Sequence, residues 1–132
     1  MTTTRRAQLR VRALQVISEQ CWDPQFDEDA LAGVLGVSRK TLDRTFSEGE
    51  SVAYAIGRAR VQRVRRSLLC GQCRSLTVAS EGAGFTNLSA MKFHFRRVFD
   101  ETPLQLQRRL RQQEEDVSRA HRWGRGTTGV WL

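Results

Sequence analysis

Residues 31–46 read LAGVLGVSRKTLDRTF. Ala32 is small, as close contact between two crossing helices requires. Gly36 follows four residues later, where a tight turn needs a positive φ. Val37 comes next and fills the corner between the helices. The spacing therefore predicts a helix-turn-helix unit.

The second helix of this unit is predicted to run from Ser38 to Glu48. The Ser38 side chain suits an N-cap, and Leu42 and Phe46 turn inward one helical turn apart. The exposed face is mainly cationic and consists of Arg39, Lys40, Asp43 and Arg44. A helix with such a face fits the major groove of DNA. For this segment alone, a helical hairpin with a solvated charged face is the alternative.

A second stretch, residues 76–99, reads LTVASEGAGFTNLSAMKFHFRRVF. It has the same order of small, turn and corner residues as the first. Ser80 takes the small position, Gly84 the turn and Phe85 the corner. The helix that follows is predicted from Asn87 to Val98. Its buried stripe is Met91, Phe95 and Val98 with Phe99 beside it, and the face that would meet DNA is Ser89, Lys92, Phe93 and Arg96.

The rest of the chain is also predicted to be helical, because it has only two prolines and no strand pattern. Further helices are expected at Arg5–Gln20, after an Asp27 cap with Leu31, Val34 and Leu35 inward, at Val52–Leu69, at Leu76–Ala83, and from Pro103 to Gln112 or Trp123. The fold class is therefore all-α with about seven helices. Two helix-turn-helix subdomains (1–51 and 71–112) flank a linker helix (52–70), and residues 113–132 form a partly mobile extension.

The charge balance points to an anionic partner. Lysine and arginine total 22 against 14 acidic residues, a net charge of +8. Nucleic acid and an anionic membrane surface both fit, and arginine, which far outnumbers lysine here, suits phosphate and guanine edges. High genomic GC content is the alternative cause of the arginine bias. With no apolar run of ~18–20 residues and no signal sequence, we expect a cytoplasmic protein without a membrane partner.

The motifs together resemble one known family. The order LA..LGVSRKTL.R.F, a long helix, the Gly84-Phe85 turn and a terminal Thr102-Pro103 is similar to the DNA-binding domain of the AraC/XylS family. The resemblance covers roughly Leu9 to Arg111. It implies two helix-turn-helix subdomains on a linker helix. It also implies recognition helices that enter successive major grooves, roughly 34 Å apart.

The chain departs from the family pattern mainly in its second unit. Phe93 stands where the family has an arginine close to DNA, and Met91 replaces a phenylalanine. Ala79-Ser80 replaces an Ile-Ala pair, and Asp100 replaces a glycine. The loop from Phe46 to Gly49 is also shorter. We therefore expect the first unit to read bases more strongly than the second.

Site residues carried over from the family fall into two groups. The resemblance implies base contacts by Lys40, Asp43, Arg44, Leu88, Ser89, Lys92 and Phe93, and phosphate contacts by Ser38, Arg39, Thr41, Asn87, Arg96 and Arg97. Asp43 either accepts from a cytosine or pairs with Arg39 or Arg44. Phe93 either touches a thymine methyl or packs against the linker helix. Arg60 resembles the linker-helix arginine of the family and is expected to be structural.

The cysteines and His94 do not predict a metal or catalytic site. Cys70 and Cys73 form a CxxC, but a zinc site needs about four ligands and no second pair exists. Cys21 is the third cysteine, and an odd number predicts reduced thiols, with a redox-sensing disulfide as the alternative. His94 is expected at the surface or against the linker helix. No cofactor, metal or catalytic residue is predicted, and an enzyme is the least favoured class.

The favoured function is a sequence-specific transcription regulator that binds double-stranded DNA as a monomer. Its expected place is the bacterial nucleoid, with RNA polymerase as a further candidate partner. Two alternatives stay open: a nonspecific or architectural DNA binder, and a protein-interaction module that acts on the transcription machinery.

Overall fold

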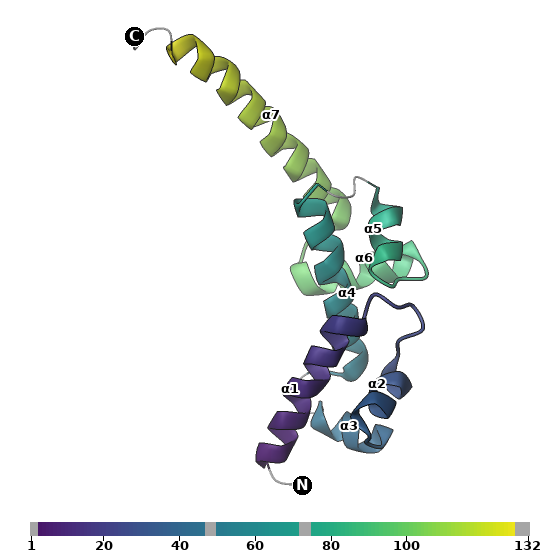
Figure 1. Ribbon diagram of the computed structural model, residues 1–132. Helices are drawn as coiled ribbons and strands as arrows, with labels where there is room; N and C mark the ends of the chain where they lie inside the picture. The colour runs from purple at the N-terminus through teal and green to yellow at the C-terminus, as the bar shows by residue number, and fades with distance from the viewer. Residues whose placement is uncertain (1–2, 47–49, 72–74, 129–132) are drawn as a thin grey trace.

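The structure is a computed structural model that describes residues 3–46, 50–71 and 75–128, with side chains as far as Arg122. These residues form seven α-helices and no strand (Figure 1). The helices are α1 Thr3–Gln20, α2 Glu28–Leu35, α3 Arg39–Thr45, α4 Val52–Leu69, α5 Leu76–Gly82, α6 Leu88–Phe99 and α7 Pro103–Thr128. The predicted all-α fold is confirmed for this part of the chain.

Side-chain caps set where most of the helices begin. In α2 to α6 the cap accepts a hydrogen bond from the third helical amide, and the five caps are Asp27, Ser38, Ser51, Ser75 and Asn87. At the start of α7 the Gln105 amide donates to Thr102 Oγ1 at 3.1 Å, and the Thr102 amide donates to Gln105 Oε1 at 2.9 Å. This reciprocal pair is a capping box, with Pro103 at the first helical position.

Two hydrophobic clusters share the helix α4. Val52, Ala55 and Ile56 in its first half pack with residues of α1, α2 and α3, including the fully buried Leu31 and Leu42. Its second half packs with α5, α6 and the start of α7 through Val61, Val64, Leu68, Met91, Phe95 and Leu106. Figure 1 shows α4 running from one group of helices to the other. Burial of two apolar stripes on one helix holds the groups together.

Two details of the first unit differ from the sequence-based prediction. Val34 is 46% exposed rather than inward, because the buried stripe of α2 lies along Leu31, Ala32 and Leu35 and leaves Val34 at its edge. The helix expected to reach Glu48 ends at Thr45, because the backbone of Phe46 leaves helical geometry, with a φ of −103° and a ψ of 7°. The sequence also predicts a short turn from Gly49 to Ser51 with Ser51 as a helix cap. Ser51 is the cap of α4, and residues 47–49 lie outside the described residues.

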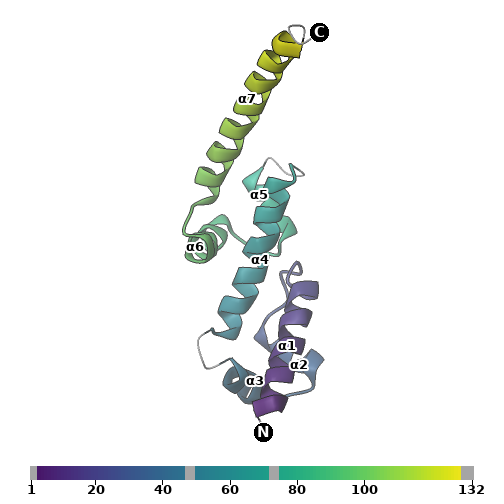
Figure 2. The same cartoon turned by 90° about the vertical axis from the view of Figure 1, so that its left-hand side faces the viewer.

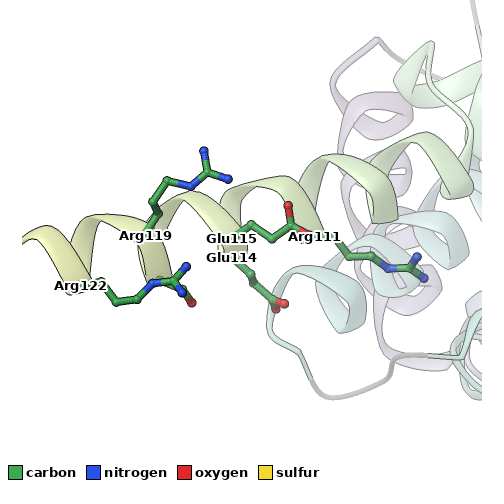
Figure 3. A pocket seen from close by; sticks show the side chains of 6 residues that line it. Arg111, Glu114, Glu115, Arg119 and Arg122 are labelled. Atoms are coloured by element: carbon green, nitrogen blue, oxygen red, sulfur yellow. The ribbon is translucent and has the colours of Figure 1, made fainter.

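The last helix is longer than predicted. The helix was predicted to end at Gln112 or Trp123, and α7 continues to Thr128. Figure 1 shows it extending away from both clusters, and every residue from Arg111 to Arg122 is exposed. Figure 3 shows alternating charges along this part, among them Arg111, Glu115 and Arg119 at four-residue spacing. Such spacing brings opposite charges together on one helix face and supports a helix that has no core of its own.

Candidate nucleic-acid interface

The two helix-turn-helix turns are closed by the same hydrogen bond. The Val37 amide donates to the Ala32 carbonyl at 3.1 Å, and the Phe85 amide donates to the Ser80 carbonyl at 3.1 Å. Ala32, Ser80 and Phe85 are buried, and Val37 packs against the first cluster. The small, corner and turn positions predicted from the sequence are therefore confirmed in both units.

The glycines in these turns have different surroundings. Gly36 has a φ of +68° and Gly84 one of +97°, the left-handed region that favours glycine. A Cβ on Gly36 would meet nothing within 4 Å, whereas one on Gly84 would lie 2.3 Å from the Cys21 carbonyl oxygen. The second turn is thus packed against the loop between α1 and α2.

Arg60 on α4 fixes that same loop. Its guanidinium donates to the carbonyls of Cys21 at 2.8 Å, Asp23 at 3.1 Å and Phe26 at 2.8 Å. Its half-buried position lowers its pKa, with desolvation as the largest cause. The structural role expected for Arg60 is confirmed, because its three hydrogen bonds hold the loop after α1 against α4.

The first candidate face presents Lys40, Asp43 and Arg44 to solvent. Arg39 is also exposed, but it pairs with Glu28 at 3.1 Å and Asp29 at 3.3 Å on α2. These two carboxylates raise the pKa of Arg39. Asp43 was expected to pair with Arg39 or Arg44, and the ion pairs of Arg39 are instead with α2.

The capping hydroxyls of α3 lie at its start. Ser38 Oγ accepts from the Thr41 amide at 3.1 Å, and the two hydroxyls are 2.9 Å apart. Ser38 is exposed and Thr41 half-buried. Both hydroxyl groups lie at the amino end of α3, where the N–H groups of a helix favour an anion.

The second candidate face is exposed at Ser89, Lys92, Phe93 and Arg96, and Asn87 is the exposed cap. Leu88 is half-buried against the second cluster. Phe93 is 63% exposed, so the alternative prediction that it packs inward against the linker helix is wrong. Its ring meets the His94 ring edge-on, with centroids 5.5 Å apart. An exposed aromatic ring is available for an apolar contact.

Arg97 differs from its neighbour Arg96. Its guanidinium lies over the Tyr54 ring of α4, 4.5 Å from the centroid. Together with Arg10 and Glu50 these residues line a hollow of about 430 Å³. Arg97 therefore lies toward α4, while Arg96 stays with the outward face of α6.

His94 of α6 contacts the middle of α4, in agreement with the prediction that it lies against the linker helix. A Cβ on Gly57 would lie 2.6 Å from His94 Nδ1, and this nitrogen is buried without a hydrogen-bond partner among the described residues. Burial, followed by Arg97 and Arg60, lowers the pKa of His94. The role of Gly57 was not predicted, although a glycine inside an 18-residue helix is itself a signal of close approach.

Two of the three cysteines, Cys21 and Cys70, lie among the described residues. Cys21 is a buried free thiol and Cys70 an exposed one, while Cys73 lies outside the described residues. Within the described ranges, no group of three His, Cys, Asp or Glu could hold a metal ion. No helix in the same ranges is long and apolar enough to span a membrane.

Two helix-turn-helix units carried by one long helix define a class of DNA-binding domain. A family model described as "Helix-turn-helix domain" matches residues 31–109, which is more than half of the chain. The chain therefore belongs to this AraC-type helix-turn-helix family, and the resemblance seen in the sequence is confirmed. Members of the family are DNA-binding transcription regulators, and this is the class of function for the chain.

Solved structures of other proteins share this fold. The C-terminal domain of AraT, a response regulator from Geobacillus stearothermophilus, is 22% identical with a TM-score of 0.67, over 76% of this chain and 84% of that chain. A DNA-binding transcriptional dual regulator from Escherichia coli K-12 is 22% identical with a TM-score of 0.68, over 79% and 93%. A probable AraC family transcriptional regulator from Rhodopseudomonas palustris CGA009 is 23% identical with a TM-score of 0.68, over 77% and 96%. No curated protein sequence matches the chain.

Proposed function

We propose that the chain is a sequence-specific regulator that inserts α3 and α6 into successive major grooves of double-stranded DNA. One observation carries the proposal. The same turn hydrogen bond occurs in two units on one continuous helix, and each turn leads into a capped helix with an exposed polar face. Two rigid units on one helix suit two grooves on one side of a duplex.

The two faces have different proposed roles. Lys40 and Arg44 on α3 are exposed donors suited to guanine edges, with Asp43 beside them as an acceptor. On α6, Lys92 and Ser89 are the polar candidates and Phe93 an apolar one, and the half-buried Leu88 is at the margin of the face. Ser38, Arg39, Thr41, Asn87, Arg96 and Arg97 are proposed to contact phosphate.

The direct test is selection of binding sites from random duplex DNA, followed by titration of the selected duplex at several salt concentrations. With roughly 6–8 phosphates neutralised, log K should fall with log salt at a slope of about −5 to −7. The selected duplex should bind more than about tenfold tighter than random DNA. A slope near zero would contradict DNA binding itself.

The alternatives are separate outcomes of this test. A steep salt slope with a ratio below about ten identifies a nonspecific or architectural binder. Partner capture that survives nuclease treatment, without a protected footprint, identifies a protein-interaction module. We further propose that the chain acts at the bacterial nucleoid as a monomer on an asymmetric site, with RNA polymerase as a candidate partner. Sedimentation of the complex would give the stoichiometry.

A further inference from the structure

A groove of about 300 Å³ lies between α1 and α4. Its lining includes the apolar side chains of Leu14 and Ile17 on α1 and Ala59 on α4, together with the uncharged polar side chains of Ser18 and Gln62. Cys21 also lines it, and burial raises the pKa of this thiol. A volume of this size is at the lower end of the range for small-molecule sites.

Three of the residues that line the groove are arginines. Arg58, Arg63 and Arg66 all line it from α4. Arg58 is neutralised by Glu50, whose carboxylate is 2.6 Å away. Arg63 and Arg66 have no carboxylate within ion-pair distance among the residues that the structure describes. They are three residues apart, so their side chains lie on the same side of α4.

Other arginines of α4 make structural contacts that Arg63 and Arg66 do not make with any described residue. Arg60 donates to three carbonyls of the loop after α1, and Arg65 lies over the Phe99 ring at 5.1 Å. Arg63 and Arg66 instead border two hollows, the groove and a second one of about 230 Å³ between α4 and α5. Two neighbouring guanidinium groups without a partner repel each other, and an anion between them would relieve that repulsion.

The groove lies away from the second recognition helix. Ala59 lines the groove and Val61 packs into the second cluster with α6, and two residues correspond to about 200° around a helix. Figure 2 shows α6 on one side of α4 and α1 on the other. A ligand in the groove would therefore not meet the exposed face of α6.

We propose that this groove binds a small organic carboxylate with an apolar body. The carboxylate would accept from the guanidinium groups of Arg63 and Arg66, whose planar forks match its two oxygens. The apolar body would lie on Leu14, Ile17 and Ala59. The proposal does not rest on the function proposed above, since it concerns a different surface and a different ligand.

Octanoate is a suitable probe, and octanol is its neutral counterpart. Calorimetric titration of the full chain should show saturable binding of octanoate to one site, and octanol should bind at least about tenfold more weakly. The double variant Arg63→Gln/Arg66→Gln should lose octanoate affinity by at least about tenfold. Arg12→Gln/Arg119→Gln is the matched control, because both arginines are exposed outside the groove and the double variant also removes two positive charges.

A second variant keeps the test independent of charge and folding. Ala59→Leu fills the groove and leaves both arginines, so it should also abolish octanoate binding in a protein whose thermal unfolding is still cooperative. Equal binding of octanol, or unchanged affinity in both variants, would overturn the proposal. Displacement of octanoate by duplex DNA would also overturn it, because the arginines would then belong to the DNA surface. Failure of DNA binding alone would leave octanoate binding intact.

Discussion

The two helix-turn-helix units have the same turn but different dependence on their surroundings. In the first unit Gly36 faces open space, and the exposed face of α3 is polar. In the second unit Gly84 is packed against the Cys21 carbonyl of the first unit, and α6 presents the exposed ring of Phe93. The comparison teaches that a repeated sequence pattern can give one self-contained unit and one that is positioned by its neighbour.

The largest expected effect compares the two turn glycines. Gly84→Ala should lower the free energy of unfolding by about 3 kcal/mol, because a Cβ at a positive φ would also collide with backbone. Gly36→Ala should lower it by about 1–2 kcal/mol, since only the φ is unfavourable. Urea unfolding of both variants measures the difference. Equal losses would mean that the second turn is no more dependent on its neighbour than the first.

The contact between Gly57 and His94 tests how α6 is held against α4. Gly57→Ala should lower the free energy of unfolding by about 1–3 kcal/mol, because the new Cβ overlaps the imidazole. Removing the ring with His94→Ala should recover part of this loss, giving a coupling of about 0.5–3 kcal/mol in a double-mutant cycle. Gly82→Ala is the control, since a Cβ there meets nothing within 4 Å. Strictly additive losses would show that the two residues do not touch.

Substitutions of Arg44 and Phe93 test whether the face of α3 reads bases more strongly than the face of α6. Arg44→Ala should reduce discrimination against the wrong base by about 1–3 kcal/mol at one position of the selected site. Phe93→Ala should change sequence preference less, because a ring contacts a thymine methyl without a hydrogen bond. Competition binding on single-base variants of the site measures both. The reverse order would make α6 the main reader.

The pH dependence of stability should come from the second unit. Burial lowers the pKa of His94 in the folded chain, so the unfolded chain binds the proton more readily. Stability is therefore full above the unfolded pKa of about 6.5 and falls as pH is lowered through it. Urea midpoints at neutral and mildly acidic pH measure the loss, and His94→Gln should reduce it. His121→Gln, on the exposed part of α7, is the control and should leave the loss unchanged.

The smallest expected effect concerns the ion pairs of Arg39 in the first unit. Glu28→Gln/Asp29→Asn should change stability little, because the pairs are largely exposed. The released Arg39 should make phosphate contact easier and steepen the salt dependence of DNA binding. Glu101→Gln/Glu114→Gln is the matched control, because it releases Arg109 from a similar pair in the second unit and also removes two negative charges. An unchanged salt slope would remove Arg39 from the phosphate contacts.

Sequence reasoning located the elements better than the contacts between them. The caps Asp27, Ser38 and Ser51 and the turn glycines were predicted correctly, because caps and positive φ angles depend on a few neighbouring residues. The predicted ends of α3 and α7 were wrong. Helix ends without a strong stop signal depend on tertiary packing, as with Phe46, or on weak interactions along an exposed helix.

The candidate site shows the same division. The exposed positions of α3 and α6 follow from the period of a helix once its buried stripe is known, so Lys40, Arg44, Ser89 and Lys92 could be predicted. The exposure of Phe93 could not be predicted, because an aromatic ring beside a core is equally compatible with burial. The pairing of Arg39 with α2 also required the crossing of two helices.

By itself, the sequence determined the class of this protein: an all-α chain with two helix-turn-helix turns, their caps and a basic surface. These features are local or compositional, and each depends on residues within a few positions of one another. Only the tertiary structure decided how the units depend on each other. Gly84 and Arg60 meet the loop after α1, and His94 meets Gly57, across 34 or more positions of the chain. Such contacts depend on the packing of α4, which local sequence patterns do not encode.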